Sequence, residues 1–314
     1  MIAKRICIIC SFSIAYLVLL TSCSQPSNLK GTTPTSRVAS PTPSPAITAT
    51  GTPDLTPVHF MTRTILSGRG RPDDLVFDPQ GRLLFSDFYN GTISRINTDG
   101  SVTVMLKGIA GPEGMVYLSD GTLIIAEQRT NRILELAPGE SSLTVLRTLP
   151  GFPGGPPCKD GVDNIALDPT SNTLIIPDSP IGNVYRMSLD GKTLTVLASG
   201  IVRPVGAAID NQGAIYVADE CGGAIVRIMP GGKITRITGF AKPDDVAFDQ
   251  HGNMLVIDLL PSIHALIRVR LTTGKHETLL SKGFIEPQGL AVDKNDNIYV
   301  SDDFANIIVE LIPA

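Results

Sequence analysis

Apolar residues alternate with polar residues in short runs through most of the chain after residue 58, and Gly, Asp and Asn separate these runs. Two runs flank the turn 78–81, as in LVFDPQGRLLF from Leu75 to Phe85. Alternation with a period of two between turn residues predicts β-strands joined by tight turns, because successive side chains of a strand point to opposite faces. The pattern therefore predicts an all-β protein.

The alternation recurs as a repeat. Each copy has an opening residue, two residues that are often acidic or Gly, an apolar run, a turn and a second apolar run that ends in an acid. The copies open at Pro72, Pro112, Val162, Pro204, Pro243 and Pro287. Third and fourth strands follow, such as 92–96 and 102–106. Repeats of about 40 residues with four strands each are typical of propeller blades. The sequence thus predicts a six-bladed β-propeller of four-stranded blades over residues 59–314.

The last copy of the repeat ends after its third strand, at Ile312. Residues 59–66 form a further apolar run that precedes the first blade and has no blade of its own. We expect this N-terminal strand, 59–66, to supply the missing fourth strand of the last blade. Closing the ring with both termini would protect the edge strands that an open propeller leaves unpaired.

Residues 1–22 have the order of a secretory signal, with Lys4 and Arg5 before an apolar run at 6–20. The end of this run, Leu-Thr-Ser-Cys, resembles the bacterial lipobox, in which cleavage leaves the cysteine as a lipid-bearing N-terminus. The sequence therefore predicts a lipoprotein anchored through Cys23 to the outside of a bacterial cell membrane. An ordinary secretion signal with an incidental cysteine is the alternative.

Residues 23–58 comprise this cysteine and a segment rich in Pro, Thr and Ser. Such a segment cannot bury enough apolar surface to offset the entropy of ordering it, so it is predicted to be a disordered linker. Its length allows it to hold the folded domain well away from the lipid.

Composition narrows the class of function. With 26 Lys and Arg against 30 Asp and Glu, the chain is not a basic nucleic-acid binder. The absence of Trp argues against WD40 propellers, whose blades end in Trp-Asp. Of five cysteines, two lie in the signal and one is the lipid site, which leaves Cys158 and Cys221. An extracytoplasmic pair is expected to form a disulfide.

Many of the acids repeat in every blade and are expected to have a structural role. Acids in turns such as 78–81 and 249–252 fit ordinary turn chemistry. The acids that close the second strand are expected to accept hydrogen bonds from backbone N–H groups of a tight loop. They are Asp87, Glu127, Asp178, Asp219, Asp258 and Asp302.

The residue after the opening residue of each repeat differs between blades. If the first strands line the channel, these six residues converge on its mouth around the pseudo-sixfold axis. They are Asp73, Glu113, Asp163, Val205, Asp244 and Gln288. Four carboxylates so close must be neutralised by raised pKa values or by a cation. Calcium takes six to eight oxygen ligands, which these carboxylates, Gln288, Asn164 and water would supply. The alternative is that each is a turn acid bonded locally.

The pattern P-x-G-L-x-x-D-x-x-G-x-I-Y-V-S-D, clearest over 204–219 and 287–302, resembles the NHL-repeat propellers and the gluconolactonase and senescence-marker-protein family. In that family a Glu, an Asn and an Asp from different blades hold a divalent metal at this place. The resemblance implies that the metal, expected to be calcium, is held by Asp73, Glu113, Asp163 and Asp244. This chain departs from the family at Val205, and at Asp74, Asn164 and Asp245, where the family usually has Gly.

The same resemblance implies lactone or ester hydrolysis, in which the metal polarises the carbonyl and a carboxylate that is not a ligand takes a proton from water. The expected catalytic residues are Asp163, Asp244 and His264, the last on the longer loop after Asp258. Four arginines near the top loops would hold an anionic substrate or point into solvent: Arg69, Arg71, Arg129 and Arg203. The alternative function is a non-catalytic propeller that binds a protein, a peptide or a carbohydrate through its top face.

Overall fold

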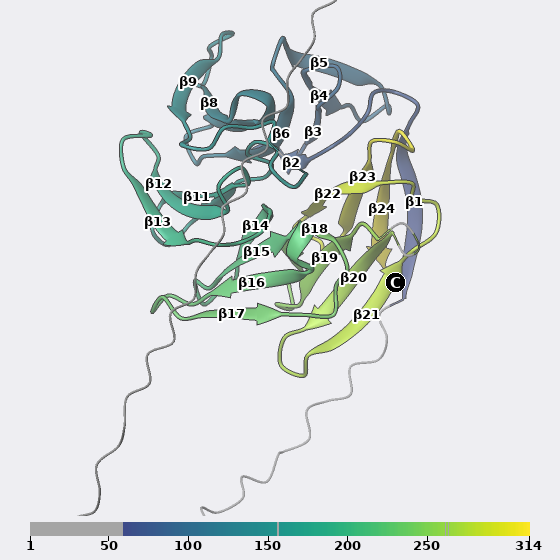
Figure 1. Ribbon diagram of the computed structural model, residues 1–314. Coiled ribbons are helices and arrows are strands. Elements are labelled where there is room, and N and C mark those ends of the chain that lie inside the picture. Colours follow the sequence, from purple (N-terminus) through teal and green to yellow (C-terminus); the bar gives the residue numbers. More distant parts are fainter. Residues whose placement is uncertain (1–58, 156, 261, 263) are drawn as a thin grey trace, which may run out of the picture. The chain divides into compact units, whose positions relative to one another are not determined.

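The computed structural model describes residues 59–314 except 156, 261 and 263 (Figure 1). The predicted signal peptide, the lipid site at Cys23 and the linker lie outside the described residues. Within the described residues, no helix has the length and apolar character needed to cross a membrane.

The described chain forms six antiparallel sheets of four strands each, arranged as the blades of a propeller (Figure 1). Blade one consists of β2 (Leu75–Phe77), β3 (Leu83–Asp87), β4 (Thr92–Ile96) and β5 (Val102–Lys107). Blade two consists of β6 (Pro112–Tyr117), β7 (Leu123–Glu127), β8 (Arg132–Leu136) and β9 (Thr144–Thr148). Blade three consists of β10 (Ala166–Asp168), β11 (Thr173–Asp178), β12 (Asn183–Ser188) and β13 (Leu194–Ala198).

Blades four and five repeat this order. Blade four consists of β14 (Pro204–Ile209), β15 (Ile215–Asp219), β16 (Ala224–Ile228) and β17 (Ile234–Ile237). Blade five consists of β18 (Pro243–Phe248), β19 (Met254–Asp258), β20 (Ala265–Arg270) and β21 (Lys275–Leu280). Two single-turn 3-10 helices follow the second strands of blades two and four, η1 (Gln128–Thr130) and η2 (Glu220–Gly222). The prediction of an all-β, six-bladed propeller is confirmed.

The sixth blade joins the two ends of the described chain. It contains β22 (Pro287–Val292), β23 (Ile298–Asp302), β24 (Ile307–Pro313) and, as its outer strand, β1 (Phe60–Ser67). Strand β1 runs antiparallel to β24, with Phe60 opposite Pro313 and Ser67 opposite Ile307. The predicted closure of the ring by the N-terminal strand is confirmed, within one residue of the expected bounds.

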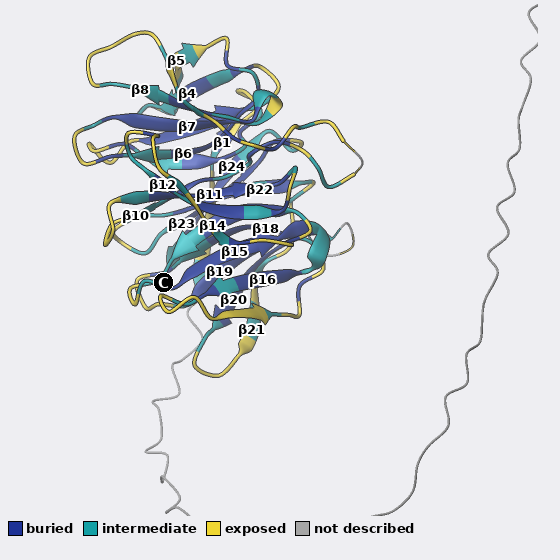
Figure 2. Ribbon diagram, turned by 60° about the vertical axis from the view of Figure 1, so that its left-hand side comes forward, coloured by how far each residue is buried: buried dark blue, intermediate teal, exposed yellow. Residues whose placement is uncertain are grey.

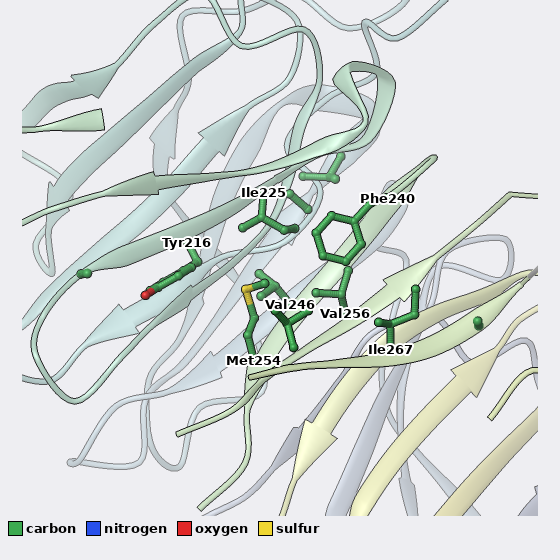
Figure 3. Close-up of a cluster of buried hydrophobic side chains, with 12 residues drawn as sticks. Tyr216, Ile225, Phe240, Val246, Met254, Val256 and Ile267 are labelled. Atoms are coloured by element: carbon green, nitrogen blue, oxygen red, sulfur yellow. The ribbon is translucent and has the colours of Figure 1, made fainter. Parts of the chain in front are cut away.

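The hydrophobic core lies between neighbouring blades. In β3, Leu84 packs with residues of blade two such as Met115, whereas the next residue, Phe85, packs with residues of blade six such as Tyr299. Both faces of the second strands are therefore covered, which explains why all their residues except Thr173 of β11 are buried (Figure 2). Figure 3 shows one such layer, in which Tyr216 and Ile225 of blade four meet residues of blade five.

The acids that close the second strands hold the loops of the top face, defined here as the face with the loops after each second strand and before each first strand. Asp87 accepts from the Arg71 N–H at 2.9 Å, and Asp219 accepts from the Arg203 N–H at 3.0 Å. Glu127, Asp178, Asp258 and Asp302 make the equivalent bonds. This prediction is confirmed, and it explains how the loops around the channel are fixed in place.

Candidate functional site

The structure brings the four predicted carboxylates together. Asp73, Glu113, Asp163 and Asp244 line one cavity of about 150 Å³ on the top face, together with Gln288. We call this cavity the mouth. Val205, which interrupts the predicted ring of polar residues, is fully buried in the apolar layer between blades four and five. The convergence of the carboxylates is confirmed.

A local irregularity in the first strands helps to position these side chains. In β6 the pairing with β7 shifts between Pro112 and Met115, so Glu113 lies within a bulge. Strand β18 has the same shift between Pro243 and Val246, which places Asp244 in a bulge. A bulge leaves residues out of the regular alternation and redirects a side chain. Glu113 and Asp244, the two acids that lie in bulges, both line the mouth.

Asp73 and Glu113 form a carboxyl pair. Asp73 and Glu113 lie close enough for each carboxyl group to affect the pKa of the other. Burial raises the pKa of Asp73 to about 8. Burial, followed by the charges of Asp73 and Asp163, raises the pKa of Glu113 well above its usual range. The pair therefore holds a proton at neutral pH.

Asp163 has a different environment. Its Oδ2 lies 3.3 Å from Nη2 of Arg203 and accepts from Nε2 of Gln128 at 3.2 Å. Burial raises the pKa of Asp163, but the Arg203 guanidinium is the largest opposing influence. For Asp244, burial and the nearby Asp163 raise the pKa well above its usual range, with Arg203 again opposing. Among the four, Asp163 is the carboxyl group that a cation contacts directly.

Arg203 is the centre of an ion network that extends over two blades. Its guanidinium also lies 3.2 Å from Oδ2 of Asp160 and forms an ion pair with Glu220. Glu220 is only 1% exposed, and its other oxygen lies 2.6 Å from Nζ of Lys242. The two cations that line the mouth are therefore both engaged by acids.

Sequence reasoning missed four charged residues that line the mouth. They are Glu220, Lys242, Glu286 and Asp303. Their positions in the repeat carried a signal, because each lies directly after a strand-closing acid or directly before an opening Pro. Both places border the top face, so the repeat would have located them.

A second ring lies below the mouth, at the next residue of each repeat. The six residues alternate around the ring between polar and Gly: Asp74, Gly114, Asn164, Gly206, Asp245 and Gly289. Asp74 accepts from the Met115 N–H of the next blade at 2.9 Å. Asp245 accepts from the Leu290 N–H at 2.9 Å and from Asn164 Nδ2 at 2.8 Å. Asp74, Asn164 and Asp245, which stand where the family usually has Gly, therefore join neighbouring blades through side-chain hydrogen bonds.

The glycines of this ring leave room for those crosslinks. A Cβ at Gly114 would come within 2.5 Å of Cα of Asn164, and one at Gly206 would come within 2.5 Å of the Asp244 carbonyl oxygen. Both distances are far below van der Waals contact. We call this alternating set the inner ring. Three of its residues, Asp74, Asn164 and Asp245, line a small space together with carboxylates of the mouth. The inner ring therefore forms the floor of the mouth.

Aromatic side chains and arginines form the rim of the mouth. The Arg71 guanidinium lies 3.5 Å from the ring centroid of Tyr89 and 4.7 Å from that of Phe304. Arg129 lies 4.3 Å from the centroid of Phe88. Arg69, by contrast, donates to the Gly100 carbonyl oxygen and does not line the mouth. None of these three arginines therefore supplies an unengaged cation to the mouth, and Arg203 is in ion pairs.

The predicted disulfide is present. Cys158, in the loop before blade three, is bonded to Cys221 in η2 of blade four. The same loop is also held by Nζ of Lys159, which donates to the Val202 carbonyl oxygen at 3.1 Å. Because Cys221 follows Glu220, the disulfide joins this loop to the ion network of the mouth.

Two predictions about chemistry are not carried further by the geometry. Leu259, at the start of the same loop, lines the mouth, but His264 does not. The catalytic role of His264 therefore stays a prediction. The second prediction is the divalent metal of the family. Among the described residues, no group of three or more His, Cys, Asp or Glu side chains is arranged to hold a metal ion. Asp163 is paired with Arg203, so the residues as placed do not fit the metal.

Comparison with solved structures identifies the fold. No family model matches the chain. A gluconolactonase from Xanthomonas campestris matches with a TM-score of 0.67 at 15% identity, over 81% of this chain and 90% of that chain. The fold is that of the gluconolactonase-like six-bladed propellers. This confirms the six-bladed propeller fold that the resemblance implied.

Proteins of other activities share this fold. Catalytically inactive virginiamycin B lyase from Staphylococcus aureus, solved with quinupristin, matches with a TM-score of 0.62 at 18% identity, over 82% of this chain and all of that chain. A chain of a nidogen–laminin complex matches with a TM-score of 0.63 at 19% identity, over 73% and 88% of the two chains. At these identities the likeness establishes the fold, and function has to be argued from the mouth.

Proposed function

We propose that the protein hydrolyses a small lactone or ester in the mouth of the propeller. The observation that carries the proposal is that carboxyl groups in two different environments share one cavity, with and without a neighbouring cation. The Glu113–Asp73 pair holds a proton, whereas Asp163 lies beside Arg203. Groups whose environments favour different protonation states are suited to act as acid and base in one reaction.

Asp163 is assigned as the general base. It removes a proton from a water molecule whose oxygen attacks the carbonyl carbon of the substrate. The positive charge of Arg203 favours the ionised form of Asp163 that this step needs. Gln128 and Gln288 line the same cavity with amide groups, which are donors for the carbonyl oxygen as its negative charge develops.

The Glu113–Asp73 pair is assigned as the general acid. When the tetrahedral intermediate collapses, the bond between the carbonyl carbon and the alkoxy oxygen breaks. The leaving oxygen takes the proton of the pair, and the product is a hydroxy acid from a lactone, or an alcohol and an acid from an ester. Asp163 then gives its proton to solvent, and the pair takes one up, which restores the starting state.

Turnover of a panel of lactones and esters, followed by pH-stat titration of the released acid, tests the proposal. Asp163→Asn and Glu113→Gln are each expected to lower turnover at least ~100-fold, as removal of a general acid or base does. Asp160→Asn is the matched control, because Asp160 also contacts Arg203 but is half-exposed and does not line the mouth. Equal activity of all three variants, or no turnover by the wild type, would contradict the proposal.

A second candidate function, binding of a protein, peptide or carbohydrate, is favoured by the exposed apolar side chains of the top-face loops. Tyr89 and Phe304 are 45% and 46% exposed, and Phe152, Ile181, Val202 and Ile285 are also exposed. Binders often present such groups around a central site. Wild-type protein that retains a ligand on its top face but turns over no lactone or ester would favour this candidate.

We also propose that the protein is tethered outside the cytoplasm by lipid on Cys23. The Leu-Thr-Ser-Cys sequence and the following linker support the anchor, and the Cys158–Cys221 disulfide is typical of an oxidising compartment. Labelled palmitate is expected to enter the wild-type protein in cells and not the Cys23→Ser variant. Equal labelling of the two proteins, or none of the wild type, would contradict the anchor.

A further inference from the structure

Acidic residues outnumber basic residues in the lining of the mouth. Seven acidic residues and two basic residues line it among the described residues. The acids are Asp73, Glu113, Asp163, Glu220, Asp244, Glu286 and Asp303, and the bases are Arg203 and Lys242. Both bases are already ion-paired with Glu220, and Arg203 also with Asp163. No lining cation is therefore left to receive an anionic substrate.

One acid of the mouth has an oxygen without a partner. Asp303 is 2% exposed, and its Oδ2 lies 3.4 Å from Nη2 of Arg71. Its Oδ1 is buried and accepts no hydrogen bond from any described residue. A buried carboxylate oxygen without a donor is unfavourable, so a ligand that brings a donor would gain by meeting it. Because Asp303 lines the mouth, a ligand in the mouth can supply that donor.

Aromatic rings line the same cavity as Asp303. They are those of Phe88, Tyr89 and Phe304. The Arg71 guanidinium already lies close to the centroids of Tyr89 and Phe304, which shows that these two rings accept a cation. Ring faces attract cations through their quadrupole, and they are used to recognise organic ammonium groups. Rings and carboxylates together thus favour an organic cation.

We infer that the substrate of the mouth is an organic cation, an ester or lactone that carries an ammonium group. Asp303 and Glu286 bind the ammonium group beside Tyr89 and Phe304, and the carbonyl group faces Asp163. This inference rests on the proposed hydrolase, and it reverses the expectation from the sequence that arginines of the top loops hold an anionic substrate.

Two unreactive γ-lactams test the inference by calorimetry with the full-length protein at pH 7. One carries a trimethylammonium group next to the carbonyl, and the other carries the uncharged tert-butyl group of the same shape. The cationic lactam is expected to bind at least 10-fold more tightly. Equal affinity for the two lactams, or no binding of the cationic one, would overturn the inference.

Variants locate the charge that is responsible. Asp303→Asn is expected to lower affinity for the cationic lactam about 10-fold and to leave the neutral lactam unchanged. Glu286→Gln, at a half-buried loop position, is a second variant that does not depend on the buried Asp303. Glu140→Gln removes an exposed acid that does not line the mouth and is the control. Loss of affinity for both lactams alike would show that Asp303 acts only through structure and would overturn its role.

The outcome also separates this inference from the proposed hydrolase. If the cationic lactam binds with the expected preference but no cationic lactone or ester is turned over, the hydrolase is wrong and the cation site stands. If neutral esters are turned over and the cationic lactam does not bind, the hydrolase stands and the substrate class is wrong.

Discussion

Nη2 of Arg203 lies 3.3 Å from Oδ2 of Asp163, and the same guanidinium contacts acids of two other positions, Asp160 and Glu220. A cation in this position lowers the pKa of the carboxyl group it touches. The contact thus sets the pH range in which Asp163 is ionised, which leads to the first prediction.

Replacing Arg203 with Met is expected to move the acidic limb of the pH–rate profile to higher pH, by about 1 unit or more. Without the guanidinium, burial raises the pKa of Asp163 further, so a higher pH is needed to ionise the base. The profile of hydrolysis from pH 5 to 9 measures the shift. Arg129→Met, which removes a rim arginine without touching Asp163, is the control and should leave the limb in place.

The buried acids of the inner ring are expected to make the protein less stable as pH rises. Burial raises the pKa of Asp74 to about 8 from its usual 3.8. Its contribution is fully present below pH 4 and is lost as pH rises through 8, at about 1.4 kcal/mol per pH unit for each such group. Urea unfolding at pH 5 and pH 8 measures the loss.

Asp74→Asn should reduce this pH dependence, because Asn keeps an acceptor for the Met115 N–H but has no charge to bury. A variant whose free energy of unfolding falls with pH as steeply as that of the wild type would show that Asp74 is not one of the groups that titrate.

Calcium and a chelator are expected to leave the melting temperature of the wild-type protein unchanged within about 1 °C. The reason is that Arg203 and Lys242 already occupy acids of the mouth, and the carboxylates as placed form no metal-binding group among the described residues. Thermal melting with 1–5 mM calcium or with chelator measures this. A clear rise of the melting temperature with calcium would instead support the metal that the family resemblance implies.

The disulfide is expected to stabilise the fold by roughly 2–4 kcal/mol, since it closes a loop between residues 63 apart. The double variant Cys158→Ser, Cys221→Ser should unfold at lower urea than the wild type. Reducing agent should lower the stability of the wild type and leave the double variant unchanged. Equal stability of the two proteins without reductant would show that the bridge adds nothing.

Gly206→Ala is expected to destabilise the propeller by about 1–3 kcal/mol, because a Cβ there would lie 2.5 Å from the Asp244 carbonyl oxygen. Gly231→Ala is the matched control, since a Cβ at Gly231 meets nothing within 4 Å and its backbone needs no positive φ. Chemical denaturation of both variants measures the difference. If Gly206→Ala matched the control, the close packing of the inner ring would be wrong.

The fold could be predicted because it depends on features that recur. The opening residue, the turn acid and the strand-closing acid such as Asp219 return in each blade, and the unpaired run at 59–66 pointed to the closing strand. Symmetry around the axis then placed Asp73 and Asp163 near each other without any structure.

What the sequence could not supply was the pairing between unlike residues at the mouth. Arg203 was identified only as one of four arginines near top loops. The repeat places Glu220 on the top face but does not say which side chain it pairs with, and Asp160 lies in a segment that does not repeat. The sequence showed that polar residues replace Gly at alternate positions of the inner ring. It could not show the hydrogen bonds of Asp74 and Asp245, because these depend on the distance between neighbouring blades.

The pairing of β1 with β24 also determines how the propeller responds to force. Phe60, where the chain enters the outer strand, lies opposite Pro313, at the end of the inner partner. When the chain is pulled before Phe60 and held at its C-terminal end, next to Pro313, the load therefore acts on the hydrogen bonds one after another, from Phe60 toward Ser67. Such geometry yields at much lower force than strands sheared along their length, so tension along the N-terminal segment would open the ring first at its sixth blade.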